Sequence, residues 1–235
     1  MPTSATPAPL LTGISSMATR ELLAELTAAY TEHTGQVVTI ASLGGVDAAK
    51  RVQAEEAFDV VILASDAIDK LIASGHLRPD SKVDLVHSGV AVAVRSGAPQ
   101  PDITSENAVR HAVLYANTLS YSTGPSGVAL AKLFERWGIA NQIKDNIITA
   151  PPGMPVGRLV AKGEVELGFQ QFSELIHIDG ITVVGPLPPD IQITTTFSAA
   201  ITTGCTREPD VRALLDFMSS TDAAAAKIRQ GMEPV

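Results

Sequence analysis

Residues 10–45 read LLTGISSMATRELLAELTAAYTEHTGQVVTIASLGG, and this stretch decides the expected fold. Its first apolar run is followed by Ser15 and Ser16 and then by apolar residues at helical spacing, which predicts a strand, a turn and an amphipathic helix. Gly35 is placed to end that helix. The apolar run Val37–Ile40 predicts a second strand. A strand, a helix and a strand in succession indicate a parallel α/β unit.

The same alternation of strand-like and helix-like segments continues to the end of the chain, with Gly and Pro in the turns. The apolar runs Val90–Val94 and Thr194–Ile201 are long enough to pass from one lobe to another. We therefore expect an α/β fold of two lobes, each with a mostly parallel sheet and with a ligand cleft between them. The expected lobes are residues 1–89 plus 198–235 and residues 90–197.

The composition suits this expectation and excludes one class of partner. The chain has 235 residues, 45% hydrophobic and 18% charged, which indicates a packed core rather than disorder. It carries 17 basic and 25 acidic residues, for a formal net charge of −8. Nucleic-acid binding needs a basic excess or a basic stripe, and the sequence has neither, so we expect no nucleic-acid partner.

Several other features narrow the expectation further. No run approaches the about 18 apolar residues of a membrane span, so no membrane insertion is expected. Cys205 is the single cysteine, which excludes a disulfide within the chain, and we expect it to be buried as a small apolar residue.

The histidines lack the spacing of metal ligands, so we expect no metal and no cofactor. Met1–Pro9 lacks a signal-peptide pattern, which indicates the cytoplasm unless a signal was trimmed from a periplasmic protein.

Four expected turns share small residues directly before a helix. The N–H groups at a helix start are unpaired and partly positive, so such turns bind anions without Lys or Arg. Ordinary caps and turns are the alternative for each of them. The turns contain Ser15 and Ser16, Gly44 and Gly45, Ser126 and Gly127, and Gly153 to Val156.

Side chains of four further residues are candidates for the same site. Gln170 and Gln171 follow a strand, and amides can donate to a carboxylate or oxyanion. A surface turn is the alternative for this pair. Arg158 lies in the first turn of a predicted helix, where a cation opposes the helix dipole, which hints at an anion nearby. Arg51 could also reach a carboxylate, although a solvated helix face is the alternative.

From Leu10 on, the chain resembles the bacterial periplasmic molybdate-binding proteins of ABC transporters, a branch of the type II periplasmic-binding-protein fold. Ser15-Ser16 and residues 41–46 resemble the family's first two ligand turns, and Pro125-Ser126-Gly127 resembles its Pro-Ala-Gly turn. Val156 stands at the position of a further backbone amide ligand. Gln171 stands where the family has a ligand tyrosine, a departure that favours a di- or tricarboxylate over molybdate.

One enzyme, aconitate isomerase, resembles the same family and interconverts trans- and cis-aconitate by an allylic proton shift. That reaction needs a base to remove a carbon-bound proton and an acid to return one. The candidate proton carriers here are His87, Tyr121 and Glu174, and no motif decides among them. Whether the chain is an enzyme is therefore left open.

Three functions remain from these observations. The first is a solute-binding protein that closes on a small anion, with an ABC transporter permease as the implied partner if it is exported. The second is an isomerase of an unsaturated polycarboxylate that uses the same cleft. The third is a cytosolic ligand sensor. We rank them in that order.

Overall fold

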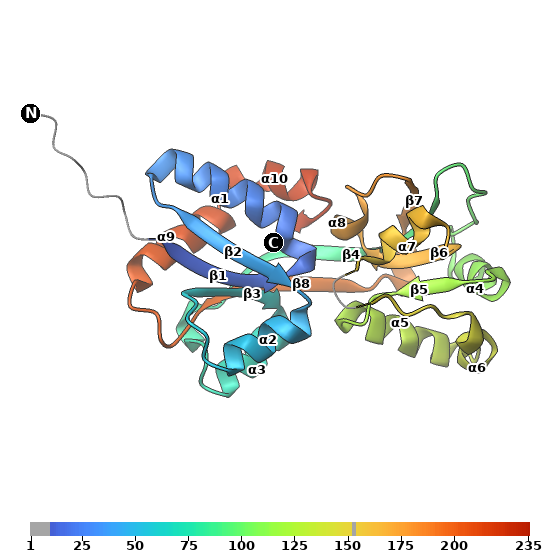
Figure 1. The fold of residues 1–235 in the computed structure, drawn as a ribbon, viewed down its shortest axis with the longest axis horizontal. Helices are drawn as coiled ribbons and strands as arrows, with labels where there is room; N and C mark the ends of the chain where they lie inside the picture. The colour runs from blue at the N-terminus through green and yellow to red at the C-terminus, as the bar shows by residue number, and fades with distance from the viewer. Residues whose placement is uncertain (1–9, 152–153) are drawn as a thin grey trace, which may run out of the picture. The chain divides into compact units, whose positions relative to one another are not determined.

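The computed structural model describes residues 10–151 and 154–235, which divide into two compact units (Figure 1). Unit 1 takes the chain up to Val86 and resumes at Thr196–Val235, and unit 2 is His87–Thr195. Two strands run through the unit boundaries, β4 (Val83–Arg95) and β8 (Thr194–Ile201). The lobe limits predicted from the sequence fall within these same two strands. The cleft expected between the lobes stays a prediction.

The sheet of unit 1 is mostly parallel, as predicted. Strand β1 (Leu11–Ser16) pairs in parallel with β2 (Val38–Leu43) on one side and with β3 (Val60–Ala64) on the other. Strand β8 is antiparallel to β3 and follows it in the strand order β2-β1-β3-β8. The carboxyl ends of β1, β2 and β3 therefore lie at one edge of the sheet.

Helices cover both faces of this sheet (Figure 1). Alternate residues of β3 explain why. Val60 and Ile62 join the core under α1 (Arg20–Thr34) and α9 (Glu208–Ser219), while Val61 and Leu63 join the core under α2 (Gly45–Gln53) and α3 (Ser65–Ala73). Gly35 ends α1 with a φ of 76°, a conformation that glycine adopts without strain. The remaining elements of unit 1 are α10 (Ala224–Arg229), β9 (Glu233–Pro234) and 3-10 turns at Met17–Thr19, Pro79–Ser81 and Thr221–Ala223.

The sheet of unit 2 is mixed rather than mostly parallel. Strand β6 (Leu167–Gln171) is parallel to β5 (Leu119–Tyr121) and antiparallel to β4. Strand β7 (Ile181–Pro186) is also antiparallel to β4. The difference from the expectation arises because the long strand β4 runs opposite to both of its neighbours in this sheet. The carboxyl ends of β5 and β6 still share one edge.

The larger core cluster of unit 2 lies between its sheet and the helices α4 (Glu106–Tyr115) and α5 (Pro125–Arg136). Phe134 of α5 packs edge-on against Phe169 of β6, with ring centres 6.2 Å apart. Glu106 of α4 accepts hydrogen bonds of 2.6 Å from the Trp137 indole and from Arg136, which joins α4 to the end of α5. The remaining elements of unit 2 are α6 (Ala140–Ile143), α7 (Val156–Lys162), α8 (Phe172–Leu175) and 3-10 turns at Lys144–Asn146 and Pro189–Ile191.

Two expectations drawn from composition can be compared with these elements. Within the two described ranges, every helix is too short or too polar to cross a membrane. Cys205 is buried, as predicted, with 5% of its surface exposed. Its thiol lies 3.4 Å from the Asp59 carboxylate, and burial raises the pKa of the thiol.

Candidate functional site

The carboxyl edge of the unit 1 sheet joins two of the predicted turns. Ser15 faces Ser42 across the parallel pair β1–β2, because the register aligns them. Ser15 is fully buried, and its hydroxyl lies 2.8 Å from that of Ser42. A hydroxyl can donate and accept at once, so the two side chains form a polar pair at the end of the strands.

The next residues of the same two strands lead into helices. Ser16 begins the 3-10 turn after β1, and its hydroxyl accepts from the Ala18 N–H at 3.3 Å. Gly44 precedes α2, and a Cβ added to Gly45 would lie 4.0 Å from the Ser16 hydroxyl. The start of α2 therefore lies beside Ser16. The structure thus brings Ser15, Ser16, Gly44 and Gly45 together. It adds Ser42, which lies in the same predicted turn as Gly44 and Gly45 but was not a candidate.

The carboxyl edge of the unit 2 sheet has the same design at the end of β5. The hydroxyls of Ser122 and Ser126 lie 3.0 Å apart across the turn that starts α5. A Cβ at Gly127 would lie 1.5 Å from the Ser122 carbonyl oxygen, so only glycine fits there. This close approach fixes the turn and sets the first N–H groups of α5 beside two hydroxyls.

Gln170 lies at the end of the neighbouring strand β6 and uses both ends of its amide within the protein. Its Oε1 accepts from the Gly157 N–H, in the first turn of α7, at 3.3 Å. Its Nε2 donates to Glu174 Oε1 at 2.8 Å. Gln170 is buried, with 4% of its surface exposed. Its side chain therefore links α7, β6 and α8, a role that the sequence did not indicate because Gly157 is 13 residues away.

Gln171 is also buried and bonded within unit 2. Oriented to satisfy its neighbours, its amide nitrogen donates to the Ser88 carbonyl oxygen at 3.0 Å and to the Ser88 hydroxyl at 2.8 Å. Its amide oxygen accepts from the Thr195 hydroxyl at 2.9 Å. The amide joins β4, β6 and the start of β8, so it holds the carboxyl end of β6 in place.

The remaining candidates differ in their surroundings. Tyr121 ends β5 beside Ser122, its ring packs edge-on against Phe134, and burial raises the pKa of its hydroxyl. Val156 is buried as the first residue of α7, whereas Arg158 is exposed two residues later. His87 is partly buried within β4. Gly153, part of the fourth predicted turn, lies outside the described residues.

Arg51, the other candidate cation, forms an ion pair with a neighbouring residue of unit 1. Its guanidinium pairs with Glu56 at 2.5 Å and lies over the Phe58 ring, 5.2 Å from the ring centre. Both members of this pair are exposed to a large extent. The carboxyl edge of unit 1 thus offers hydroxyl and N–H donors, and Arg51 contributes no free charge to it.

Two observations concern ligands of other kinds. In the part of the chain that the structure describes, no three His, Cys, Asp or Glu side chains are grouped as a metal site would require. A cavity of about 540 Å³ lies in unit 2 against Val94, Leu167 and Tyr115. Leu167 is the first residue of β6, so this cavity lies at the opposite end of that strand from Gln170 and Gln171.

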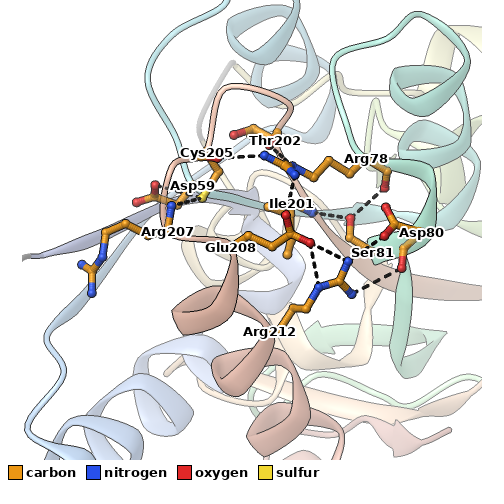
Figure 2. Close-up of polar contacts among 10 residues, drawn as sticks. All are labelled: Asp59, Arg78, Asp80, Ser81, Ile201, Thr202, Cys205, Arg207, Glu208 and Arg212. Atoms are coloured by element: carbon orange, nitrogen blue, oxygen red, sulfur yellow. Dashed lines mark hydrogen bonds and ion pairs between the residues drawn. The ribbon is translucent and has the colours of Figure 1, made fainter.

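The opposite edge of the unit 1 sheet carries a cluster of paired charges (Figure 2). Arg78 pairs with Glu208 and donates to the Cys205 carbonyl at 2.9 Å. Glu208 also pairs with Arg212 at 2.7 Å, and Arg212 reaches Asp80 at 2.8 Å. Each cation here has a carboxylate partner, so the cluster ties the first turns of α9 to the segment before β4.

Comparisons with known proteins identify relatives of the whole chain. The sequence matches the family model of bacterial extracellular solute-binding proteins over residues 11–233. Aconitate isomerase from a Pseudomonas species is 39% identical over 240 residues, which cover 99% of this chain and 90% of that protein.

Solved structures with the same fold are more distant in sequence. The periplasmic molybdate-binding protein of Azotobacter vinelandii aligns with a TM-score of 0.79 and 17% identity, covering 94% of this chain and 98% of its own. The sulfate-binding protein of Mycobacterium tuberculosis aligns with a TM-score of 0.78 and 16% identity, covering 96% and 87%. The predicted type II periplasmic-binding-protein fold is therefore confirmed, as is the resemblance that implied it.

Proposed function

Because this chain belongs to the family of bacterial extracellular solute-binding proteins, we propose that it binds a small anion, specifically a di- or tricarboxylate. The observation that carries the proposal is the pairing of hydroxyls at strand ends in each unit. Ser15 and Ser42 form one pair and Ser122 and Ser126 the other, each beside the start of a helix. Hydroxyls and helix N–H groups together stabilise carboxylates.

A carboxylate is favoured over molybdate or sulfate by two features of this chain. Gln171 stands in place of the tyrosine expected for molybdate, and its amide is bonded to Ser88 and Thr195. The relative with 39% identity is an enzyme that acts on aconitate, according to its name. Both features support an organic acid with several carboxylates.

The family description also bears on location and partners. An extracellular solute-binding protein functions outside the cytoplasm, so we propose a periplasmic location for the mature protein. If it serves transport, an ABC transporter permease is the proposed partner. Secretion of the full-length gene product into the periplasm, followed by cell fractionation, tests the location.

The second candidate function is isomerisation of aconitate. It is favoured by the identity to aconitate isomerase, which extends over 99% of this chain. Tyr121 and Glu174 both lie at the carboxyl edge of the unit 2 sheet, where a proton carrier would be needed. A binding protein and an isomerase would use the same donors, so the two candidates differ only in whether a proton moves.

A ligand panel tests the binding proposal. Thermal unfolding is measured with molybdate, sulfate, citrate, cis-aconitate and trans-aconitate. A ligand at 100 times its Kd stabilises the folded protein by about 2.7 kcal/mol, which raises the Tm by roughly 5–10 °C for a chain of this size. We expect carboxylates to raise the Tm and the inorganic oxyanions to leave it unchanged. The reverse pattern would contradict the proposal.

A separate assay tests the isomerase candidate. The protein is incubated with trans-aconitate, and the two isomers are separated by chromatography. Appearance of cis-aconitate at a rate proportional to protein concentration supports the enzyme. If trans-aconitate binds in the ligand panel and the isomer ratio never changes, the chain is a binding protein for this ligand.

A further inference from the structure

The starting observation is a chain of hydrogen bonds from the first turn of α7, through Gln170, to Glu174. The Gly157 N–H donates to Gln170 Oε1 at 3.3 Å, and Gln170 Nε2 donates to Glu174 Oε1 at 2.8 Å. Gln170 is 4% exposed, whereas Glu174 is partly exposed at the start of α8. A buried amide thus fixes the orientation of a carboxylate that still reaches the surface.

The packing around this chain leaves Gln170 little freedom. A Cβ at Gly157 would lie 2.6 Å from the Ile178 side chain, so α7 packs closely on the segment after α8. A Cβ at Gly168, two residues before Gln170 on β6, would lie 2.6 Å from the Val160 side chain of α7. The amide therefore lies between closely packed elements, and its hydrogen bonds set the position of the Glu174 carboxylate.

A carboxylate at this edge is unfavourable for a protein that only binds anions. Like charges at short range repel, and the side chains of Ser122, Ser126 and Gln170 at this edge of unit 2 are neutral. A general base, by contrast, has to be an ionised group that is held in a defined direction. The cost of placing a negative charge beside an anionic ligand is explained if the carboxylate takes part in a reaction.

We propose that Glu174 is the general base of the allylic proton shift and that Gln170 is its positioning residue, an inference that rests on the isomerase candidate above. Glu174 takes a proton from the methylene carbon of trans-aconitate. The electron pair of that C–H bond forms a new double bond between the methylene carbon and the central carbon. The electron pair of the old double bond then forms a C–H bond at the carbon on the other side of the central carbon. Glu174 returns that proton, so the enzyme ends the cycle unchanged.

Tyr121 suits a different role at the same edge. Burial raises the pKa of its hydroxyl, so at neutral pH the group keeps its proton and can act as a hydrogen-bond donor. It can stabilise the negative charge that develops on a substrate carboxylate during the proton shift. It cannot serve as the base without first losing that proton.

The test measures binding and turnover separately in Glu174→Gln. We expect kcat for trans-aconitate to fall by at least about 100-fold, the lower range for loss of a general base. We also expect the Kd for trans-aconitate, measured by calorimetry, to stay the same or decrease, because a negative charge is removed from the site. With trans-aconitate deuterated at its methylene carbon, the wild-type protein carries part of the deuterium to the far carbon of the old double bond, and the variant does not.

Gln170 is tested with two variants of similar size. Gln170→Met removes both hydrogen bonds, and we expect kcat to fall about 10- to 100-fold with KM changed less than threefold, since misplacement of a reacting group lowers the rate more than binding. Gln170→Glu keeps an acceptor for Gly157 and replaces the donor to Glu174. If Gln170 served only to anchor α7, Gln170→Glu would have a higher kcat than Gln170→Met. We expect kcat to stay low in both variants, because neither donates a hydrogen bond to Glu174.

Controls keep the outcomes distinct. Glu135→Gln removes an exposed carboxylate at the end of α5 and should leave kcat and KM unchanged. Glu174→Asp serves if Glu174→Gln does not fold, and it should retain a small fraction of turnover. Wild-type protein that does not isomerise aconitate removes the isomerase candidate itself. Wild-type activity that persists in Glu174→Gln overturns the assignment of the base and leaves the enzyme in place.

Discussion

The two edges of the unit 1 sheet carry opposite kinds of polar group. At the edge shown in Figure 2, the side chains of Arg78, Glu208, Arg212 and Asp80 are charged, and each has a partner of opposite sign. At the carboxyl edge, Ser15 and Ser42 are neutral and lie beside the start of a helix. The paired charges hold segments of the chain together, whereas the neutral hydroxyls are the groups that we propose as donors to a ligand. The difference separates polar groups that hold the fold from those proposed to bind a ligand.

The largest expected effect concerns Gly127 on the donor side of this comparison. Gly127→Ala places a Cβ 1.5 Å from the Ser122 carbonyl oxygen, so the turn before α5 has to move. We expect a loss of about 3 kcal/mol in the unfolding free energy, together with loss of carboxylate binding. Urea unfolding followed by circular dichroism measures it. Gly124→Ala is the matched control, because its Cβ would meet nothing closer than 3.9 Å.

The next effect concerns the paired edge. Arg78→Ala leaves the Glu208 carboxylate with one partner fewer and frees the Cys205 and Thr202 carbonyls. We expect a loss of about 2 kcal/mol in stability with an unchanged Kd for cis-aconitate. Arg20→Ala, which removes an exposed pair with Glu21, should cost far less. A large change in the Kd for Arg78→Ala would contradict the separation of the two edges.

A smaller effect is expected from Ser15→Ala. The substitution removes the hydrogen bond between Ser15 and Ser42 and one proposed ligand donor. We expect the Kd for cis-aconitate to rise roughly fivefold, which corresponds to about 1 kcal/mol. Isothermal calorimetry measures it, with Ser219→Ala at the end of α9 as the control. A change in stability without any change in Kd would move the proposed site away from Ser15.

An effect of similar size concerns Lys227, a charge that belongs to neither edge. Lys227 is 2% exposed, and burial lowers its pKa. The unfolded chain then binds more protons than the folded one between the folded pKa and the unfolded value near 10.4, so stability rises with pH across that window. Lys227→Met should raise the unfolding free energy at pH 7 by ~1 kcal/mol. It should also remove that part of the rise with pH, which unfolding at pH 7 and pH 10 will show.

The sequence predicted the turns of the candidate site that depend on neighbouring residues. Ser16, Gly45 and Gly127 lie at helix starts, as local spacing predicted, and their contact with a ligand stays a prediction. The roles of Gln170 and Gln171 depend on Gly157, Ser88 and Thr195, which folding brings close. An amide that donates to a ligand and an amide that joins two strands look the same in a sequence.

The fold, too, was predicted from the sequence only where it depends on neighbouring residues. The parallel strands of unit 1 were predicted because each apolar run is followed by its own helix. The mixed sheet of unit 2 was not, because strand direction there depends on the path of β4 between β6 and β7. The cluster of Arg78 and Glu208 joins residues 130 positions apart, a distance at which sequence spacing carries no information.

The indole of Trp137, which donates to Glu106, gives this protein a fluorescent reporter confined to unit 2. The sequence contains one tryptophan, so emission excited near 295 nm arises from that residue alone. Breaking its hydrogen bond or exposing it to water will change the emission, and unit 1 contributes nothing to that emission. Comparing the fluorescence transition with the circular dichroism transition will therefore show whether the two units unfold together or one after the other.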